Sequence, residues 1–395
     1  MPGSDVVIVG GGIVGAACAY TLSLAGATVT LFERDELAAG ASGRNLGLVD
    51  LPRDPVLDPV ARRSVALYLE ATRDPPSPVH LDREPIGTLA VGIGDEEAAM
   101  VREEARAAEG AGIRIERLDA AALREAEPAL TPEISEAWLF HEGRRVDPGA
   151  LTVALATLAR SRGAAIRHHL PVRRLLTRGD RVSGVVTDET VTEADSVLLA
   201  AGPWSVGLLR PLGIRIPVVG VRGWLVHLSA SPIPIHRWIE GAARMLWRRE
   251  AERVTARDFA AGVAPEPEVG AMIQPSPDGT VVAGTSREPA LTWEPFGLDM
   301  PRAVTRAAIR LVPGLADAHV LATWSGIRPM SPDERPLVGW LRPGLFVCTG
   351  HGSEGVILGG GTAELATALL LGAEPPLDPA PFDPLRFERR EPGEG

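Results

Sequence analysis

The segment from residue 5 to residue 33 most strongly limits what this chain can fold into. Residues 5–9 form a short apolar run, rich in β-branched residues, which is typical of a strand buried on both faces. Residues 10–15 follow with the sequence GGGIVG, residues 16–24 then have the composition of a helix, and residues 28–32 form a second β-branched run. Strand, glycine turn, helix and strand in this order predict the first unit of an α/β fold with a parallel, Rossmann-type sheet.

The glycine turn fits the pattern G-x-G-x-x-G, and each glycine has a physical task. Gly10 permits a tight turn, Gly12 lets the backbone approach a pyrophosphate, and Gly15 lets the helix pack closely on the strand. Ile13 and Val14 lie in the same turn, where we expect both to contact the cofactor, and the helix that follows offers free N–H groups and a partial positive charge to phosphate groups. The turn therefore predicts a dinucleotide-binding site.

An acidic residue stands where such a site needs one. Glu33 ends the second predicted strand, and Arg34 follows it. A carboxylate at this place can accept hydrogen bonds from the free 2′-OH of an adenosine ribose. This feature fits NAD and FAD equally well.

Three later segments favour FAD. Residues 40–45 (GASGRN) offer small and hydrogen-bonding side chains close to the first phosphate site, and residues 195–204 form another buried strand ending in a small-residue turn. Residues 345–352 end in Gly-His-Gly, and residues 359–361 are three glycines that we expect to lead into a helix ending at Leu371. A second helix N-terminus aimed at the ligand would stabilise the negative charge of a reduced flavin. We expect further cofactor contacts from Arg34, Ala41, Ser42, Arg44, Asn45, Leu46, Val172, Ala200, Gly202, Trp204, Arg328, Gly350, His351, Gly352, Gly355 and Val356.

Composition excludes several other classes. The net charge of −11 argues against nucleic acid as a partner, and the two cysteines, Cys18 and Cys348, form neither a disulfide framework nor a metal-binding spacing. Residues 6–32 are uncharged and longer than the ~20 residues of a membrane helix. The glycines and β-branched runs in them instead favour two buried strands with a helix between. With no charged region typical of a signal peptide, we expect a soluble, cytoplasmic protein without a membrane span.

The ordered motifs resemble one family. The segments VVIVGGGIVGAACAYTLSLAGATVTLFER, GASGRNLG, RRVDPGALTVALATLARSRGA, ADSVLLAAGPW, WSGIRPMSPDERPLVG and GLFVCTGHGSEGV are similar to the D-amino-acid oxidase superfamily of FAD-dependent oxidoreductases. The resemblance is greatest to the branch of glycine oxidase, D-amino-acid dehydrogenases and the small subunits of opine and proline dehydrogenases. It covers nearly the whole chain, but residues 229–270 match poorly.

The resemblance implies two interleaved domains. Residues 1–80, 141–215 and 322–395 would form the FAD-binding domain, and residues 81–140 and 216–321 an α+β substrate domain built on an antiparallel sheet. On the sequence alone, residues 87–93, 221–228 and 280–284 are strand-like, and residues 96–110 and 149–160 helical. We interpret residues 231–265, rich in Trp, Arg and Pro, as a loop or lid near the active site.

The resemblance also implies two catalytic residues. Oxidation of an amine by a flavin depends mainly on positioning, and a guanidinium can hold an amino acid's carboxylate through two hydrogen bonds. Arg328, in the segment SGIRP, stands where the resembling enzymes place that arginine. His351, between two glycines, should lie against the flavin.

Some positions depart from the best-known members. Gly326 stands near the cysteine that holds FAD covalently in monomeric sarcosine oxidases, so we expect non-covalent FAD. Glu354 replaces a lysine that helps to hold the carboxylate there, and Met272 replaces a tyrosine of glycine oxidases. Candidates for the wall of the substrate site are therefore Trp224, His227, Trp247, Met272, Gln274 and Glu354.

These observations favour FAD-dependent oxidation of the C–N bond of a small amino acid or secondary amine to an imine, which water hydrolyses to a 2-oxo acid. Two alternatives stay open: oxidation of the C–O bond of a 2-hydroxy acid, and a flavin-bearing subunit of a hetero-oligomeric amine or opine dehydrogenase. The electron acceptor would be O2, a quinone or a partner protein, and the protein could form homo- or hetero-oligomers. All 40 basic residues are arginine, so the lysine with which sarcosine oxidases activate oxygen is absent, and this favours a dehydrogenase.

Overall fold

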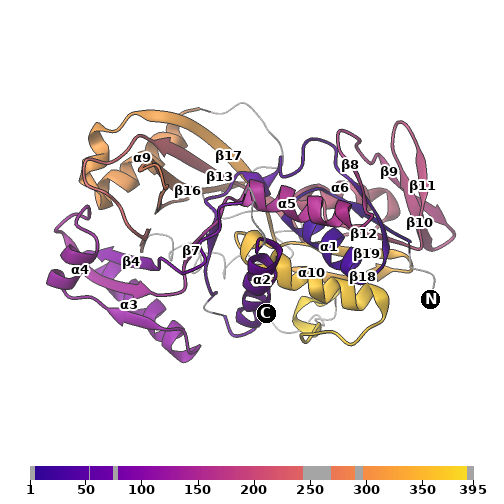
Figure 1. The fold of residues 1–395 in the computed structure, drawn as a ribbon, viewed down its shortest axis with the longest axis horizontal. Helices are drawn as coiled ribbons and strands as arrows, with labels where there is room; N and C mark the ends of the chain where they lie inside the picture. The colour runs from indigo at the N-terminus through magenta and orange to yellow at the C-terminus, as the bar shows by residue number, and fades with distance from the viewer. Residues whose placement is uncertain (1–4, 53, 74–78, 243–267, 290–296, 389–395) are drawn as a thin grey trace.

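The computed structural model describes residues 5–52, 54–73, 79–242, 268–289 and 297–388. Two large sheets organise this part of the chain (Figure 1). Within it, no helix combines the length and apolar character needed to cross a bilayer.

The first sheet has six strands. Its order is β18 (Leu337–Arg342), β19 (Leu345–Thr349), β12 (Ser196–Leu199), β1 (Asp5–Val9), β2 (Thr28–Phe32) and β8 (Ala165–Arg167). All neighbours are parallel except β18 and β19. The uncharged stretch at the start of the chain thus forms two parallel strands joined by helix α1 (Ile13–Leu24), as its glycines and β-branched runs predict.

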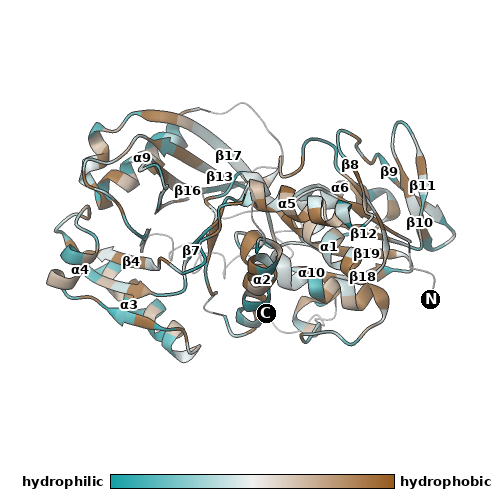
Figure 2. Ribbon diagram, viewed as in Figure 1, coloured by the Kyte–Doolittle hydropathy of each residue, from teal (hydrophilic) through white to brown (hydrophobic). Residues whose placement is uncertain are grey.

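Alternation along the strands separates two cores. Val6 and Ile8 face a cluster shared with α1 and two further helices, α5 (Pro148–Ser161) and α10 (Gly355–Leu371). Val7 and Val9 face a cluster under the three-stranded sheet of β9 (Arg174–Arg178), β10 (Arg181–Val186) and β11 (Val191–Glu193). Hydrophobic residues accordingly gather where the helices meet this sheet (Figure 2). Both faces are covered, which is why β1 is apolar from Val6 to Val9.

Helix α10 corrects one expectation. It begins at Gly355, so Gly359, Gly360 and Gly361 lie inside it and do not form a loop before it. They permit a close approach of helix α2 (Asp58–Ala71): side chains at Gly360 and Gly361 would overlap the α2 backbone at Ser64 and Val60. The N-terminus of the helix is therefore closer to His351 in the sequence than expected, at Gly355 and not after Gly361.

The second sheet has eight strands. Its order is β17 (Val320–Met330), β13 (Val219–Leu228), β16 (Val281–Pro289), β15 (Glu268–Pro275), β14 (Trp238–Gly241), β4 (Thr88–Ile93), β6 (Ile134–Phe140) and β5 (Ile115–Arg117). Neighbours are antiparallel except β14 and β4. Three helices lie beside this sheet (Figure 1). They are α3 (Gly94–Gly110), α4 (Ala120–Ala126) and α9 (Asp299–Leu311).

The interpretation of residues 231–265 as a loop or lid is wrong for residues 238–241, whereas residues 231–237 are irregular as expected of a loop. Residues 238–241 form β14, which lies between β15 and β4 with Trp238 and Ile239 buried. Their large apolar side chains stabilise this strand within the sheet. Residues 243–265 lie outside the described residues.

Shorter elements connect the two sheets. Strands β3 (Leu48–Val49) and β7 (Arg144–Arg145) pair with each other, and β17 runs across the predicted domain boundary at residues 321 and 322. The remaining elements are α6 (Ser205–Leu209) and the 3-10 turns η1 (Ala41–Gly43), η2 (Gly202–Trp204), η3 (Arg210–Leu212), η4 (Pro313–Asp317) and η5 (Ala380–Phe382). The division into two discontinuous domains stays a prediction.

Candidate active site

A cavity of about 550 Å³ extends from the glycine turn of the first sheet to the second sheet. Its lining includes Gly10, Gly12 and Glu33 at one end, and Arg328 and Met272 from the second sheet. Segments widely separated in the sequence thus meet around one elongated space.

The glycine turn lets the backbone come close to the cavity. Gly10 has a φ of 115°, and a side chain there would overlap the backbone of Ala200 on the neighbouring strand segment. Gly12 precedes the first turn of α1 and leaves room for the Ser42 hydroxyl, which accepts a hydrogen bond from Ile13 N over 2.9 Å. Gly15 does not line the cavity, because it faces the Gly10 carbonyl and permits the close packing of helix on strand. A helix N-terminus that is preceded by glycines and bordered by a hydroxyl group is suited to phosphate binding.

Glu33 is held firmly at the outer end of the cavity. Its Oε2 atom accepts a hydrogen bond from Gly11 N over 2.6 Å, and its Oε1 atom accepts one from Asp35 N over 2.9 Å. Beside it, the guanidinium of Arg34 lies 4.0 Å from the ring centre of Trp204. Val172 lines the same end. The carboxylate is therefore oriented towards the place where an adenosine ribose would lie.

The segment after β2 is braced by its own polar side chains. Arg44 donates from Nε to the Ala39 carbonyl over 2.7 Å, and Asn45 donates from Nδ2 to the carbonyls of Ala41 and Ser42. Each of these residues lines the cavity, as does Leu46. The bracing fixes this loop against the N-terminus of α1.

His351 is buried where β19 gives way to α10. It is 3% exposed, lies 3.0 Å (Nε2) from the hydroxyl of Thr362, and lines the cavity. Gly352, Gly355 and Val356 line it too, whereas Gly350 does not. The Gly352 amide donates to the Pro329 carbonyl over 2.8 Å, so this turn is joined to the end of β17.

Two buried thiols lie behind this turn. Cys18 of α1 and Cys348 of β19 are hydrogen-bonded, and this bond together with burial raises the pKa of Cys18. For Cys348 the bond to Cys18 and the nearby His351 outweigh burial and lower the pKa of the thiol to about 6. Cys348 lines the cavity next to His351.

Arg328 is fixed at the second-sheet end of the cavity. Its Nη2 atom donates to the Thr285 hydroxyl over 2.6 Å, and its Nη1 atom donates to the Ser286 carbonyl over 3.1 Å. Arg287 lines the same end, is 7% exposed, and donates from Nη2 to the Ser353 hydroxyl over 3.3 Å. Two guanidinium groups, from the strands on either side of β13, thus line one space.

Carboxylates also line this end. Glu240 of β14 is 2% exposed, and Glu354 precedes α10. Met272 and Leu225 supply apolar surface between the charged groups. The end of the cavity therefore presents both signs of charge on an otherwise apolar wall.

Three of the predicted wall residues lie elsewhere. Trp224 points to the opposite face of β13 from its neighbours Gly223 and Leu225, and it donates from Nε1 to Glu288 over 2.7 Å. His227 lies 2.9 Å (Nε2) from the Thr280 hydroxyl, towards the far end of the strand. Gln274 lies two residues beyond Met272 in the same direction and does not reach the cavity. The sixth candidate, Trp247, lies outside the described residues.

The structure adds lining residues that the sequence reasoning missed. At the second-sheet end they include Gly223, Glu240, Thr285 and Arg287. Glu240 was missed because its segment was interpreted as a loop. A single charged residue within the otherwise apolar sequence WIEG could have indicated a functional side chain. Thr285 and Arg287 lie where β13 and β16 lose regular register, which no sequence pattern marks.

The residues present fit FAD. Glycines leave the backbone open beside the α1 N-terminus, Glu33 is oriented for a ribose, and the cavity continues past His351 to the second sheet. Ser42 and Arg44 stand at the turn between these parts with donors suited to a pyrophosphate. The fit extends over both halves of the molecule.

Comparison with known proteins agrees with this geometry. Residues 5–369 match the DAO family model, described as FAD dependent oxidoreductase. Glycine oxidase of Pseudomonas aeruginosa is 29% identical over 388 residues, which cover 96% of this chain and 98% of the relative. D-amino acid dehydrogenase of Methylobacterium radiotolerans is 28% identical over 433 residues, covering 94% and 96%.

A solved structure shows the same fold. The crystal structure of glycine oxidase from Geobacillus kaustophilus matches with a TM-score of 0.82 and 26% identity, covering 98% of this chain and 99% of the other. The predicted α/β fold class, the cofactor FAD and the family resemblance are confirmed. The chain belongs to the DAO family of FAD-dependent oxidoreductases.

Proposed function

We propose that this protein oxidises the C–N bond of a small amino acid or N-substituted amino acid. The observation that carries the proposal is the pairing of charges at the second-sheet end of the cavity, where Arg328 and Glu240 line the same space. A zwitterionic amino acid carries a carboxylate for the first and an amine for the second. A 2-hydroxy acid offers only the carboxylate.

Arg328 would bind the substrate carboxylate. Its bonds to Thr285 and Ser286 fix the plane of the guanidinium, and a planar donor pair binds a carboxylate in one orientation. Orientation matters because the reacting C–H bond must point at the flavin. Bound FAD supplies the two-electron acceptor for that bond.

His351 and the turn around it would form the boundary between substrate and cofactor. The imidazole is buried and tied to Thr362, which keeps it from rotating. The apolar surface of Met272 and Leu225 excludes water from the reacting atoms. The imine product then leaves this surface and is hydrolysed to a 2-oxo acid and an amine or ammonia.

The names of the relatives support an amine donor, since glycine oxidase and D-amino acid dehydrogenase both act on amino acids. One of these names denotes an oxidase and the other a dehydrogenase, two enzyme types that use different electron acceptors, so both types fit the family. The chain lacks lysine, and we propose on this ground a dehydrogenase that passes electrons to a quinone or a partner protein.

Anaerobic mixing of the FAD-loaded protein with a substrate panel tests the proposal. The panel contains glycine, sarcosine, D-amino acids, L-proline, an opine and 2-hydroxy acids, and the loss of oxidised-flavin absorbance is followed. We expect bleaching by an amine class, and admission of air then separates oxidase from dehydrogenase. Bleaching by 2-hydroxy acids alone would overturn the proposal.

A further inference from the structure

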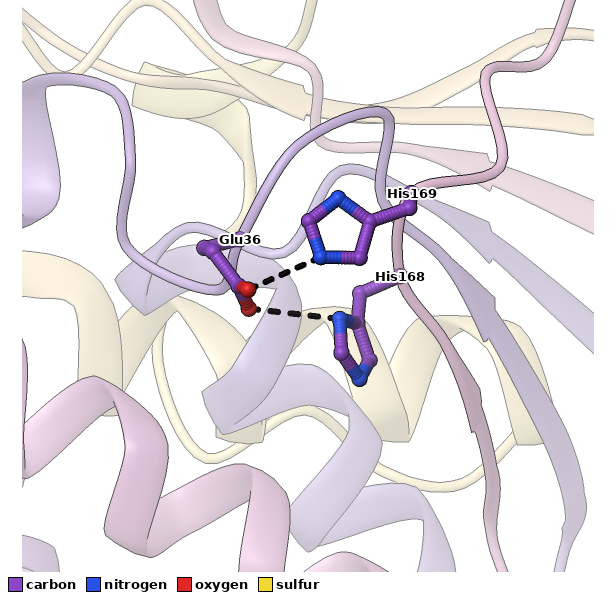
Figure 3. Close-up of side chains that lie close together, drawn as sticks. All are labelled: Glu36, His168 and His169. Atoms are coloured by element: carbon purple, nitrogen blue, oxygen red, sulfur yellow. Dashed lines mark hydrogen bonds and ion pairs between the residues drawn. The ribbon is translucent and has the colours of Figure 1, made fainter.

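Three side chains outside the cavity converge at the surface where the chain leaves β2 and β8. They are Glu36, His168 and His169 (Figure 3). Oε1 of Glu36 lies 2.8 Å from Nε2 of His169, and Oε2 lies 3.2 Å from Nδ1 of His168. The three side chains offer ligand atoms that lie within 4.8 Å of one another.

His168 and His169 are consecutive residues, yet their side chains point to the same carboxylate, which is unusual. In an extended chain, neighbouring side chains point to opposite faces. Here β8 ends at Arg167, and His169 has a φ of 57°, which turns its ring back to the side of His168. The two ring centres are 4.8 Å apart, and both rings meet the same carboxylate.

The backbone holds the two segments together. Glu33 N donates to the Arg167 carbonyl over 2.8 Å, and His169 N donates to the Asp35 carbonyl over 3.1 Å. Leu170 N donates to the Glu33 carbonyl over 2.9 Å. These bonds flank Glu36 and the histidine pair, so the three side chains start from positions fixed by the fold.

Two imidazoles and one carboxylate form a ligand set for a borderline transition metal and not for Mg²⁺ or Ca²⁺, which prefer oxygen ligands. A tetrahedral Zn²⁺ ion with bonds of about 2.0–2.2 Å holds its ligand atoms roughly 3.3 Å apart. The two Glu36–histidine distances are already close to this spacing. We propose that Glu36, His168 and His169 bind one divalent transition-metal ion, with water at the fourth position.

The proposed ion lies outside the cavity and takes no part in the proposed reaction. None of its three ligands lines the cavity, whereas Asp35 and Val172, from the same two segments, do. The ion would therefore connect the two segments that wall the outer end of the cofactor site. Its role is structural.

Calorimetric titration of the metal-stripped, untagged, FAD-loaded protein with Zn²⁺ tests this site. We expect one ion per chain, with binding weakened about tenfold or more in each of Glu36→Gln, His168→Ala and His169→Asn. Asn at position 169 tolerates the left-handed backbone. His319→Ala, at an exposed histidine away from the cluster, should bind Zn²⁺ like the wild type.

A second signal identifies the ligands. Co²⁺ in the same site should give the visible absorption of a four-coordinate ion, and each of the three cluster variants should lose it while keeping bound FAD. Mg²⁺ should neither bind nor compete. Absence of stoichiometric Zn²⁺ binding, or equal affinity in the wild type and all three variants, would overturn the proposal.

Discussion

Gly223 on β13 leaves the space that the guanidinium of Arg328 occupies. A Cβ atom on Gly223 would overlap the Nη1, Cζ and Nη2 atoms of Arg328. On the other side, Thr285 and Ser286 of β16 accept the hydrogen bonds of the same group. The orientation of the proposed carboxylate anchor thus depends on three strands of the second sheet.

Gly223→Ala should therefore impair the proposed substrate binding without unfolding the protein. The added methyl group meets the end of a flexible side chain and not backbone, so Arg328 moves while the strand stays. A shift of the anchor by about 1 Å lowers kcat/KM by roughly a hundredfold. Steady-state kinetics with the substrate found in the panel measures this.

A glycine on an exposed helix provides the control. Gly110 ends α3, and a side chain there would meet nothing within 4 Å. Gly110→Ala should leave kcat/KM unchanged and slightly stabilise the protein. Equal kinetics of Gly223→Ala and wild type would show that Arg328 does not need its present orientation.

Arg328→Ala should raise KM for a carboxylate-bearing substrate at least about a hundredfold, the size expected when a charged hydrogen-bonded pair is lost. FAD should be retained, because the glycine turn and Glu33 at the other end of the cavity are unchanged. Arg328→Lys keeps the charge but not the paired donors, so it should recover only part of the affinity. An unchanged KM in Arg328→Ala would remove this residue from the proposed function.

The cofactor end of the site could be read from the sequence because its chemistry is local. Gly10, Gly12 and Glu33 lie within one strand–helix–strand unit, and the pattern that builds the unit also places these residues around the ligand. Asp147 was likewise predictable as a helix cap: its Oδ1 accepts from Ala150 N over 2.9 Å at the start of α5. Short-range patterns specify such features.

The substrate end could not be read in the same way because it is assembled across strands. Trp224 and Gly223 are adjacent in sequence, yet only the glycine faces the cavity, and which of the two does so depends on the register of β13. Arg287 and Glu240 reach the same space from β16 and β14. A shift of one residue would exchange inward and outward side chains, and no single-strand pattern fixes that register.

Glu33→Gln should weaken FAD binding. The substitution removes the negative charge and leaves an amide that can no longer accept hydrogen bonds from both Gly11 N and Asp35 N. The glycine turn therefore loses a stabilising hydrogen bond, and the ribose loses a carboxylate acceptor. We expect an increase in the dissociation constant of about tenfold or more. Fluorescence titration of the apoprotein with FAD measures the constant.

Glu36→Gln is the matched control for that experiment. It lies three residues further along the same loop, but its side chain points to His168 and His169 and does not line the cavity. With a chelator present, its affinity for FAD should equal that of the wild type. A loss of the same size in both variants would mean that general loop loosening, and not the Glu33 carboxylate, explains the effect.

The ion pair of Asp82 and Arg145 should stabilise the region around β7, which lies between the two sheets, and this stabilisation should depend on pH. Burial opposes ionisation of Asp82, but the hydrogen bonds from the Arg145 side chain and backbone outweigh it and hold the pKa of Asp82 below its usual value. A carboxyl group whose pKa is lowered by folding stabilises the folded state fully at pH values above its ordinary pKa of 3.8. This contribution is lost as the pH falls through the lowered pKa of the folded state. The pair is therefore intact at neutral pH.

Asp82→Asn should lower the free energy of unfolding at pH 7 by about 1–3 kcal/mol, and the difference from wild type should shrink once the pH falls below the ordinary range of the carboxyl group. Urea unfolding at several pH values measures this. Asp188→Asn is the control, because its partner Arg173 and the carboxylate are both well exposed, and it should have little effect. An Asp82→Asn difference that persists unchanged in acid would contradict the electrostatic explanation.

Zn²⁺ should slow the loss of FAD if Glu36, His168 and His169 bind it. Asp35 and Val172 line the outer end of the cavity, and the ion would connect the two chain segments to which they belong. For these two segments to separate, the metal would have to dissociate as well. A ligand that binds only the closed arrangement stabilises that arrangement by mass action. Free flavin fluorescence after dilution should thus rise severalfold more slowly with saturating Zn²⁺ than with a chelator in the wild type, and at the same rate in both conditions in Glu36→Gln. Wild-type protein that binds one Zn²⁺ ion yet releases FAD at an unchanged rate would show that these two segments do not separate when the cofactor leaves.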